Sequence, residues 1–589
     1  MKIKSINISN FRSIRQLTMD FNQITIIVGP NNAGKSNILS ALNLFFTSST
    51  RGITDIDFHK RNVKEPIKIS VKFCDLSQAE QATFKNYIVE HELNVRKTIS
   101  MDESGTVTTK LQGLVNSPKD PILRSESFDS NKDEILSRIK EGRLPNYFLS
   151  EKGSLTKKSF QTGLETYISE NSDSIEFDRP QWSVSFFGWK NVAQGKFVEI
   201  IYVPAIKEAA DELKSSSAYM GILIERLFEG LNKDENYQKT KNSYEKISDG
   251  FSSNSTGSSR FSEIVELEKK IGEKVSEHIP GIKAKLYVNF PNFLEIVSKS
   301  LNLTLDDGVE TSVEFKGHGL QRAVIMAMLR LYAELLSEST EQKMGKSSSM
   351  VLAIEEPELY LHPHHQRKLY DVLKRISEVN QVIFCTHSSY FVNLPDYESI
   401  RIVNKDSDSK STFVRKSRGN IFQNQSDKTT FRTLSNFDPT KSELFFSKRV
   451  ILVEGPSERV AIRQIAEKTN YSLDGNGVTI IECEGKTGIP IFMEVLNSFQ
   501  IPYVVIHDTD LKNNMSENQK NTENDRNERI KNLANGNKVI TFSPDLEGEL
   551  GIPIKNEKPY NIYRMMSEKS IDNISKSFVN KIQDLLNAN

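Results

Sequence analysis

The chain has 589 residues, which makes a single hydrophobic core implausible and predicts two or three domains. Hydrophobic residues make up 37% and charged residues 26%, the balance of an ordinary soluble protein. Lys and Arg together number 77, as do Asp and Glu, so the net charge is zero. Net charge therefore neither favours nor excludes nucleic acid, and a nucleic-acid binder of this composition must segregate its charge locally.

Cysteine usage and hydropathy bear on where the protein works. Cys74, Cys385 and Cys483 are scattered without paired spacing, which excludes a zinc ribbon and predicts a reducing, cytoplasmic setting. The N-terminal residues alternate as a strand does and contain no signal-peptide core. No apolar run reaches the ~20 residues that span a bilayer, so no membrane partner is expected.

The first strong motif is a phosphate-binding loop. An alternating strand is predicted at 3–8 and a buried strand at 24–28, followed by Gly29-Pro-Asn-Asn-Ala-Gly-Lys-Ser36 and a helix from about Lys35. This run fits G-x-x-x-x-G-K-[ST] in the strand–loop–helix context of a P-loop. Lys35 would reach the β- and γ-phosphates and Ser36 would ligate Mg²⁺. The residues expected to bind ATP here are Gly29, Asn32, Gly34, Lys35 and Ser36.

The next stretch separates two halves of the first domain. Mixed strands and loops are expected over 60–203, with a core strand at 197–203. From 206 to 282 the pattern becomes helical, interrupted by a polar loop at 252–259. An apolar stripe in this block suits either pairing with a partner subunit or packing on its own domain, and comprises Ile264, Leu267, Ile271 and Val275.

The second half of the nucleotide site follows a later strand. Met350–Ile354 runs into Glu355, expected on the magnesium side, and Glu356, expected to polarise the attacking water. Many such strands end in Asp-Glu, so the Glu-Glu pair is a departure. The strand at 381–385 places His387 where ABC-type ATPases carry a switch histidine.

Three further features resemble ABC-type and SMC-like ATPases. Gly317-His-Gly319-Leu-Gln-Arg resembles a degenerate ABC signature, in which Gly319 would contact the γ-phosphate from the opposite subunit, so that the heads must pair. Asn10-Phe-Arg12 resembles a first-strand motif of those heads, which implies Arg12 near the nucleotide. Lys35 and Glu355 lie more than half the chain apart, as in heads interrupted by an insertion.

From 441 onward strands and helices alternate as in a parallel α/β unit. Strands are predicted at 449–453, 478–482 and 503–507. Carboxylates follow the first and third strands, at the sheet edge where α/β proteins hold their sites. They are Glu454, Glu458, Asp508 and Asp510. This grouping resembles the Toprim signature E-G-x-x-E plus D-x-D.

The converging acids predict a hard cation, because without local lysines they would repel one another. Mg²⁺ or Mn²⁺ fits oxygen ligands, whereas zinc does not. Two such ions can activate water and stabilise the leaving oxygen of a phosphodiester. Glu547 is the candidate second-metal ligand, and Lys558, or alternatively Lys555, would neutralise the transition state.

The whole arrangement resembles the OLD (overcoming lysogenization defect) family of nucleases. The resemblance rests on Phe445–Gly455, Tyr202–Ala205 and Gly477–Lys486, and the late acids with Lys558-Pro559 resemble the Gabija branch. It implies an α/β fold with an ABC-type P-loop ATPase head (1–205 and 283–403), an inserted helical dimerisation block (206–282), a linker (404–440) and a C-terminal Toprim domain (441–589). It also implies a homodimer or tetramer, a role in anti-phage defence, and in some members a helicase or a retron reverse transcriptase with its RNA–DNA hybrid.

The leading interpretation is an ATP-binding, Mg²⁺-dependent DNA endonuclease. One alternative is a non-cleaving, ATP-gated DNA clamp or DNA repair ATPase with Toprim as a binding module. Another is a topoisomerase or primase, but rejoining DNA needs a tyrosine in a separate breakage domain, and none is visible. Cleavage specificity and the sign of the ATP effect are open.

Overall fold

The computed structural model describes most of the chain in two compact units. Unit 1 holds Met1–Val203, Lys343–Glu358 and Pro363–Asn589, and unit 2 holds Pro204–Gln342 and Leu359–His362. The structure does not describe residues 48–51, 117, 125–127, 151–152, 172–173, 184–185, 187–196, 206–230, 232–233, 252–259, 280–281, 283, 287–290, 292, 294–295, 297–302, 341–349, 420, 423–428, 430–438, 552–557 and 588–589.

These units differ from the predicted limits at the insertion. Unit 2 runs to Gln342 instead of ending at 282, because the long helix α10 (His318–Thr340) belongs to it. The ATPase core and the C-terminal domain share unit 1, and the predicted linker 404–440 between them stays a prediction. Much of that linker, and the polar loop 252–259, lie outside the described residues.

A six-stranded sheet forms the ATPase core, in the order β15-β14-β3-β13-β12-β9. All neighbours are parallel except β15, which pairs antiparallel with β14. Strands β12 and β13 are buried along their whole length, as a sheet covered on both faces requires. The bounds are β3 Ile24–Val28, β9 Glu199–Val203, β12 Met350–Glu355, β13 Gln381–Cys385, β14 Ile400–Lys405 and β15 Thr412–Arg415.

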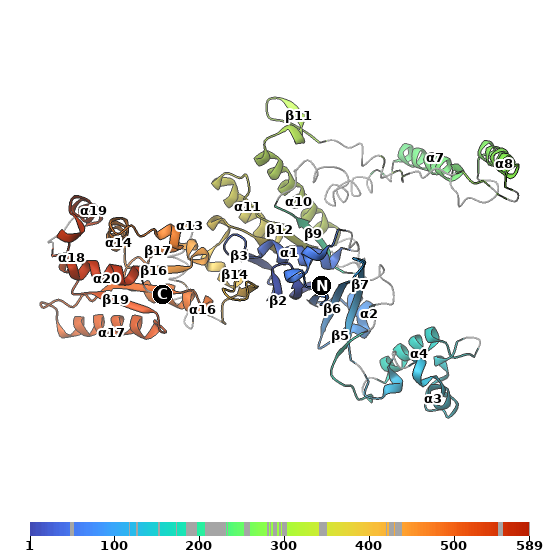
Figure 1. The fold of residues 1–589 in the computed structure, drawn as a ribbon, viewed down its shortest axis with the longest axis horizontal. Helices are drawn as coiled ribbons and strands as arrows, with labels where there is room; N and C mark the ends of the chain where they lie inside the picture. The colour runs from blue at the N-terminus through green and yellow to red at the C-terminus, as the bar shows by residue number, and fades with distance from the viewer. Residues whose placement is uncertain are drawn as a thin grey trace. The chain divides into compact units, whose positions relative to one another are not determined.

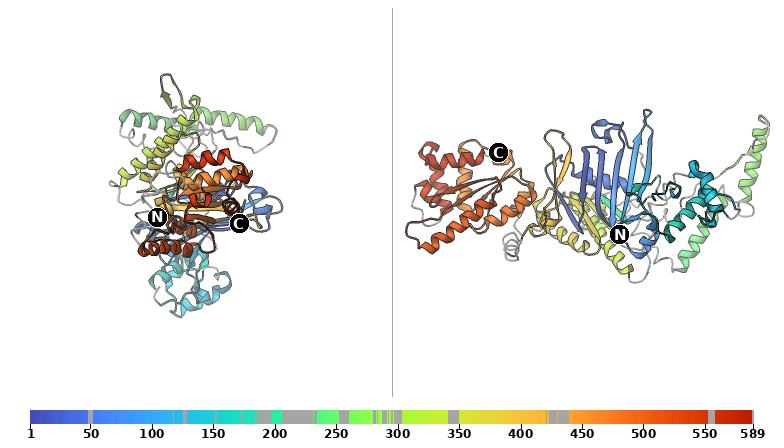
Figure 2. Two further views of the ribbon diagram at one scale, coloured as in Figure 1. Left: turned by 90° about the vertical axis from the view of Figure 1, so that its left-hand side faces the viewer. Right: turned by 90° about the horizontal axis from the view of Figure 1, so that it is seen from below.

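An antiparallel sheet packs with helix α1 (Lys35–Phe46) in one hydrophobic core. Its order is β2-β1-β4-β6-β7-β8, with β5 on β6, and Figure 2 shows its strands, in blue, side by side. The buried face of α1 is as predicted from the 3.6-residue period, with Ile38, Leu39, Leu42 and Phe45 inside. The bounds are β1 Lys2–Phe11, β2 Ile14–Asp20, β4 Ile67–Cys74, β5 Ile88–Val89, β6 Glu92–Met101, β7 Val107–Val115 and β8 Gln181–Trp182.

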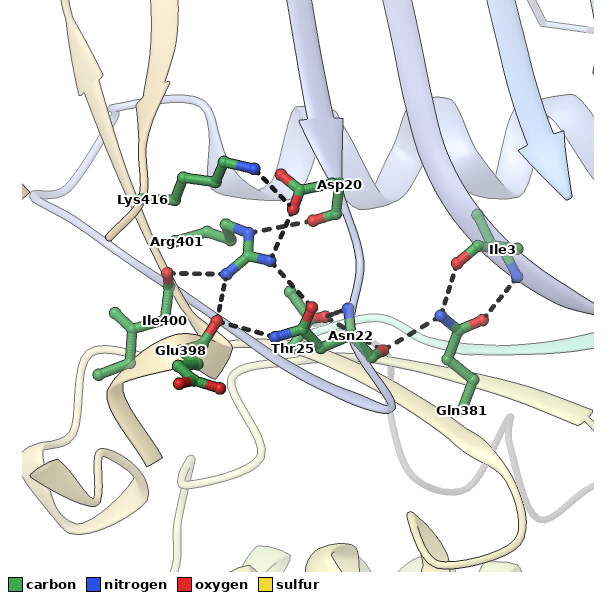
Figure 3. A network of polar contacts seen from close by, with 9 residues as sticks. All are labelled: Ile3, Asp20, Asn22, Thr25, Gln381, Glu398, Ile400, Arg401 and Lys416. Carbon is green, nitrogen blue, oxygen red and sulfur yellow. Dashed lines mark hydrogen bonds and ion pairs between the residues drawn. The ribbon is translucent and has the colours of Figure 1, made fainter. Parts of the chain in front are cut away.

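Buried polar side chains connect the two sheets at the end of β3 away from the P-loop (Figure 3). Gln381 accepts from the Ile3 amide at 2.9 Å and donates to the Ile3 carbonyl at 2.7 Å, so its side chain substitutes for a strand partner. The Arg401 guanidinium, 2% exposed, donates to the Asp20 carbonyl and carboxylate and to the Glu398 carbonyl. A buried charge needs such full pairing, which holds the sheets in one register.

Helices occupy part of the range where strands and loops were predicted. Between β7 and β8 the chain forms α3 (Phe128–Lys140) and α4 (Lys157–Glu170) around a separate small core. Ile135 and Ile139, and likewise Phe160 and Leu164, are four residues apart and buried. The prediction was wrong here because polar residues dominate both helices and leave only this short apolar period.

Within unit 2, α7 (Glu235–Phe251) and α8 (Ser262–Ser276) carry the predicted helical character (Figure 1). Ile264 is buried, Ile271 and Val275 are half-buried, and Leu267 is exposed. Unit 2 also contains the hairpin β10 (Thr304–Asp306) and β11 (Glu310–Ser312). Whether the rest of the apolar stripe pairs with a partner subunit or packs on its own domain stays a prediction.

The C-terminal domain is a parallel four-stranded sheet in the order β17-β16-β18-β19. The three predicted strands match β16, β17 and β18 to within about a residue, and helices alternate with them as expected. No described helix is both long and apolar enough to cross a membrane. The bounds are β16 Arg449–Val453, α14 Pro456–Lys468, α15 Leu473–Asn476, β17 Val478–Glu482, α16 Ile489–Phe499, β18 Tyr503–Asp508, α17 Glu517–Leu533, β19 Lys538–Phe542, α18 Leu546–Leu550, α19 Lys558–Glu568 and α20 Lys576–Leu586.

Candidate functional site

The P-loop requires its glycines because other strands approach it closely. Gly29 and Gly34 have φ of 148° and 105°, and Asn32 is also left-handed at 64°. A Cβ on Gly29 would lie 2.1 Å from the Val403 carbonyl oxygen, and one on Gly34 would lie 2.4 Å from Thr412 Oγ1. Only glycine combines this backbone with this clearance. The loop is therefore covered by β14 and β15.

Lys35 and Ser36 lie where a P-loop needs them, in the first turn of α1. The Lys35 ammonium is buried and donates to the carbonyls of Gly29 and Pro30, at 3.1 Å each. Burial lowers the pKa of Lys35, partly offset by Glu356 and Glu358 nearby. Ser36 is exposed in the first turn of the helix.

The acids Glu355 and Glu356 at the end of β12 and the histidine after β13 lie at adjacent strand ends. Glu355 is buried and accepts a 2.7 Å hydrogen bond from the Tyr202 hydroxyl on β9. Glu356 has a left-handed φ of 43°, and its carboxylate lies 3.7 Å from His387 Nε2. Burial and the Lys35 charge lower the pKa of His387. The structure thus brings Lys35, Glu356 and His387 into one electrostatic neighbourhood.

For Arg12 and Gly319, the predicted contact with ATP stays a prediction. Arg12 donates from Nε to Asp57 at 2.9 Å, although its neighbour Ser13 accepts from Asn37 of α1 at 2.8 Å. Gly319 lies in unit 2, where a Cβ would meet the Tyr360 carbonyl at 2.9 Å. The helix after Gly317 is present as predicted, but a contact of Gly319 with a second subunit stays a prediction.

In the C-terminal domain, neighbouring parallel strands bring the first acids together. Glu454 follows β16 and Asp508 ends β18, and Glu454 Oε1 accepts from the Asp508 amide at 2.8 Å. Glu458 lies in the first turn of α14, 6% exposed, where its Oε2 accepts from the Gly455 amide at 3.0 Å. The three carboxylates therefore meet at the C-terminal edge of the sheet.

These carboxyls resist ionisation. Burial, and then Glu454 and Glu458, raise the pKa of Asp508 to about 8, while burial and Glu454 raise that of Glu458 to about 7. Burial also raises the pKa of Glu454. Asp508 Oδ1 is buried without a hydrogen-bond partner among the described residues. Like charges in a desolvated site produce this pattern, and a nearby cation would relieve it.

Lysines accompany the outer acids, so the expectation that none would be local was wrong. Asp510 pairs with Lys486 at 2.7 Å, and Glu547 pairs with Lys558 at 2.6 Å. Lys512 pairs with Asp545 at 2.9 Å. Lys558 was predicted from the sequence, whereas the pairs of Lys486 and Lys512 join separate segments of the chain, so only the fold reveals them. Lys555 lies outside the described residues.

The donor set fits a hard divalent cation, although the described residues contain no preformed group of three or more His, Cys, Asp or Glu that could hold one. The unpartnered Asp508 Oδ1 and the raised pKa values of its neighbours are what a missing positive charge would leave. Carboxylate oxygens suit Mg²⁺ or Mn²⁺. The residues that would hold the ion are Glu454, Glu458, Asp508 and Asp510, with Glu547 beside them.

Sequence reasoning missed several contributors to both sites. Tyr202 was noted only as part of a resemblance, yet its hydroxyl holds Glu355. Glu358 accepts from the His387 amide at 2.6 Å and was given no role from the sequence. Glu523 of α17 lies 3.1 Å from Lys486. No local pattern marks Glu523, because its helix is polar apart from Ile530 and Leu533.

A P-loop core followed by a parallel sheet with carboxylates at its edge defines an ATPase joined to a Toprim domain. Residues 1–392 match the AAA ATPase domain family, and residues 445–510 match the TOPRIM domain described as overcoming lysogenization defect protein-like. The chain belongs to the OLD family of nucleases, with an AAA ATPase domain and an OLD-like Toprim domain. The expected α/β fold with an ATPase head and a C-terminal Toprim domain, and the enzyme class, are confirmed.

Relatives extend over most of the chain. The OLD nuclease of Thermus scotoductus is 25% identical over 97% of this chain and 95% of its own length. The Old nuclease of Escherichia phage P2 is 25% identical over 87% and 78%, and endonuclease GajA of Bacillus cereus is 22% identical over 87% and 75%. An SMC head bound to the C-winged helix domain of ScpA aligns with 70% of this chain and 97% of its own at 14% identity, with a TM-score of 0.34.

Proposed function

We propose that this nuclease is a Mg²⁺-dependent DNA endonuclease whose phosphodiester cleavage takes place at the Toprim carboxylates and is controlled by ATP in the head. The observation that carries the proposal is Asp508. Its carboxylate is buried beside Glu454 and Glu458, and one of its oxygens has no partner among the described residues. An uncompensated acid cluster costs free energy, and a cation-dependent reaction explains why it is kept.

When bound, Mg²⁺ would supply Lewis acidity, and in a two-metal arrangement it would act on both the attacking and the leaving oxygen. Glu454, Asp508 and Asp510 would hold the ion, with Glu458 completing this group. Glu547 is the candidate ligand for a second ion. Lys558, paired with Glu547 at 2.6 Å, would neutralise charge on the phosphate.

In the head, Gly29, Asn32, Gly34, Lys35 and Ser36 would bind the triphosphate, with Ser36 and Glu355 on its magnesium ion. Glu356 would polarise water, held near His387 at 3.7 Å. Arg12 would approach the nucleotide through the Ser13 segment, and Gly319 would act from a second subunit. We therefore include pairing of the heads, as a homodimer or tetramer, in the proposal.

The test is nicking of supercoiled plasmid by the purified full-length protein with Mg²⁺. Asp508→Asn keeps the shape of the side chain and removes its charge, and cleavage should fall by at least about 100-fold, as for loss of a group that stabilises the transition state. Glu568→Gln, on the exposed end of α19, is the matched control and should cut as the unaltered protein does. Equal nicking by the Asp508→Asn variant would overturn the assignment.

A non-cleaving DNA clamp is the second candidate, favoured by one observation. Lys486, Lys512 and Lys558 already neutralise three acids, which would allow the outer part of the cluster to persist without metal. The clamp hypothesis expects ATP-dependent retention of DNA without nicking at any Mg²⁺ or Mn²⁺ concentration. A role in anti-phage defence, with or without a helicase or a retron reverse transcriptase and its RNA–DNA hybrid, is part of the leading proposal.

A further inference from the structure

Lys486 is a buried lysine with a fixed place beside the acidic centre. It lies in the turn after β17, is 7% exposed, and its ammonium is 2.7 Å from Asp510 Oδ2 and 3.1 Å from Glu523 Oε2. A buried ammonium is stable only when it is paired, so both contacts are needed to keep it there. Burial raises the pKa of Glu454, and the Lys486 charge partly opposes this rise, which places that charge within range of the first acid.

The backbone of Asp510 is fixed independently of Lys486. Asp510 has a left-handed φ of 57°, and its amide donates to the Pro544 carbonyl at 2.8 Å. The preceding Thr509 carbonyl accepts from Asn527 Nδ2 at 3.0 Å. These contacts set the position of the Cα atom but not the direction of the carboxylate. The direction is set by Lys486, which occupies Oδ2 and leaves Oδ1 for another partner.

Glu523 anchors the lysine from the other side. Its carboxylate is 13% exposed and also pairs with Arg526 on the same helix, so α17 carries a rigid acceptor. Because it is paired with both Asp510 and Glu523, the Lys486 ammonium stays in place within range of the Glu454 carboxylate. The lysine therefore holds one carboxylate oxygen of Asp510 in a fixed position.

We propose that Lys486 is a positioning residue for metal binding: its hydrogen bond to Asp510 Oδ2 aims Oδ1 at the cation shared with Asp508 and Glu454. This inference rests on the proposed function, because it takes the Toprim carboxylates to be a divalent-metal site. It goes beyond that function by assigning a role to a lysine whose ammonium, among the described residues, bonds to Asp510 and Glu523 alone.

Loss of the Lys486 charge and loss of its hydrogen bond should change the metal affinity in opposite directions. A positive charge beside a cation site repels the cation, so removing the charge alone should tighten metal binding. Losing the hydrogen bond releases the Asp510 side chain and should weaken metal binding, because its rotamers must then be ordered on binding. Lys486→Met and Lys486→Gln are matched in length and charge and differ in whether a donor remains for Asp510.

The experiment measures Mn²⁺ affinity of the full chain by electron paramagnetic resonance, together with thermal unfolding and plasmid nicking. Lys486→Met should bind Mn²⁺ about tenfold more weakly than Lys486→Gln, the size expected for a hydrogen bond to a charged group. Lys486→Arg, which keeps charge and donor, should stay within about threefold of the unaltered protein. Lys538→Met, which removes an exposed lysine paired with Asp584, is the control.

Two failures are distinguishable. If Lys486→Met binds Mn²⁺ as tightly as Lys486→Gln, or more tightly, the lysine acts through charge alone and the inference is overturned. A tenfold loss in Lys486→Arg would overturn it as well, even if the Met variant did not fold. If the unaltered protein and Asp508→Asn bind Mn²⁺ equally, the metal site of the proposed function fails, whatever Lys486 does.

Discussion

At Asp508, burial and the neighbouring carboxylates oppose ionisation of the side chain. Its folded pKa of about 8 stands far above the ordinary 3.8, because burial and the neighbouring Glu454 and Glu458 penalise its charge. The folded protein therefore keeps a proton that the unfolded chain has lost. Stability from this source is complete below the unfolded pKa and is lost as pH rises through the folded value.

The first prediction follows from this sign. With a chelator present to remove divalent metal ions, the unfolding temperature of the protein should fall as the pH is raised from 6 to 8.5. The reason is that the pKa values of Glu458 and Asp508 in the folded protein are raised to about 7 and about 8. Mg²⁺ should restore more stability at pH 8.5 than at pH 6, because the ionised carboxylates bind it. Asp508→Asn should flatten both trends in thermal unfolding experiments. Parallel pH profiles for the two proteins would contradict the assignment of the charge to Asp508.

At the scale of single elements, strand β15 has a contact at the P-loop. Thr412 donates from Oγ1 to the Ala33 carbonyl at 2.9 Å and lies 2.8 Å from Ser13 Oγ. Its amide also donates to the Ser13 carbonyl at 3.0 Å. The conformation of the P-loop therefore depends on a strand far along the chain, which pairs with β14 beside β3.

Thr412→Val tests this dependence with little change in shape. The variant leaves the buried Ala33 carbonyl without its donor, which costs about 1–3 kcal/mol. ATP affinity, measured by titration calorimetry, should fall by about five- to tenfold. Ser411→Ala is the control, because Ser411 accepts from the Arg15 amide and does not touch the P-loop. Unchanged affinity in Thr412→Val would show that the loop holds its shape without β15.

The sequence predicts the elements whose signal is local. The strand before Gly29, the helix from Lys35 and the alternation after residue 441 follow from periodicity and turn residues, and the structure reproduces them closely. The contacts of Lys486 and Glu523 could not be predicted, because they join a loop to a polar helix through tertiary packing. The helices α3 and α4 were missed because few of their residues are apolar, so their periodic signal is weak and packing stabilises them.

At the scale of the whole molecule, the other end of β15 contacts the Toprim domain within unit 1. Arg415 Nη1 donates to the Gln500 carbonyl at 3.0 Å, and the Arg418 amide donates to Ser498 Oγ at 2.8 Å. Ser498 and Gln500 lie at the end of α16, directly before β18, whose last residue is Asp508. One short strand therefore contacts both the P-loop and the element that leads to the carboxylates.

The last prediction is that this strand carries the effect of ATP on cleavage. In Arg415→Ala/Ser498→Ala, ATP hydrolysis and nicking without nucleotide should stay within about twofold of the unaltered protein, because neither residue touches a reacting group. Coupling between two sites typically changes an equilibrium by about 5- to 150-fold. In this double variant the change in nicking caused by ATP, whichever its direction, should shrink toward none, because the contacts that link β15 to α16 are lost. Arg564→Ala/Ser567→Ala, confined to contacts within α19, is the matched control and should keep the full effect. A double variant of Arg415 and Ser498 that still responds fully to ATP would mean that the signal reaches Asp508 by another route.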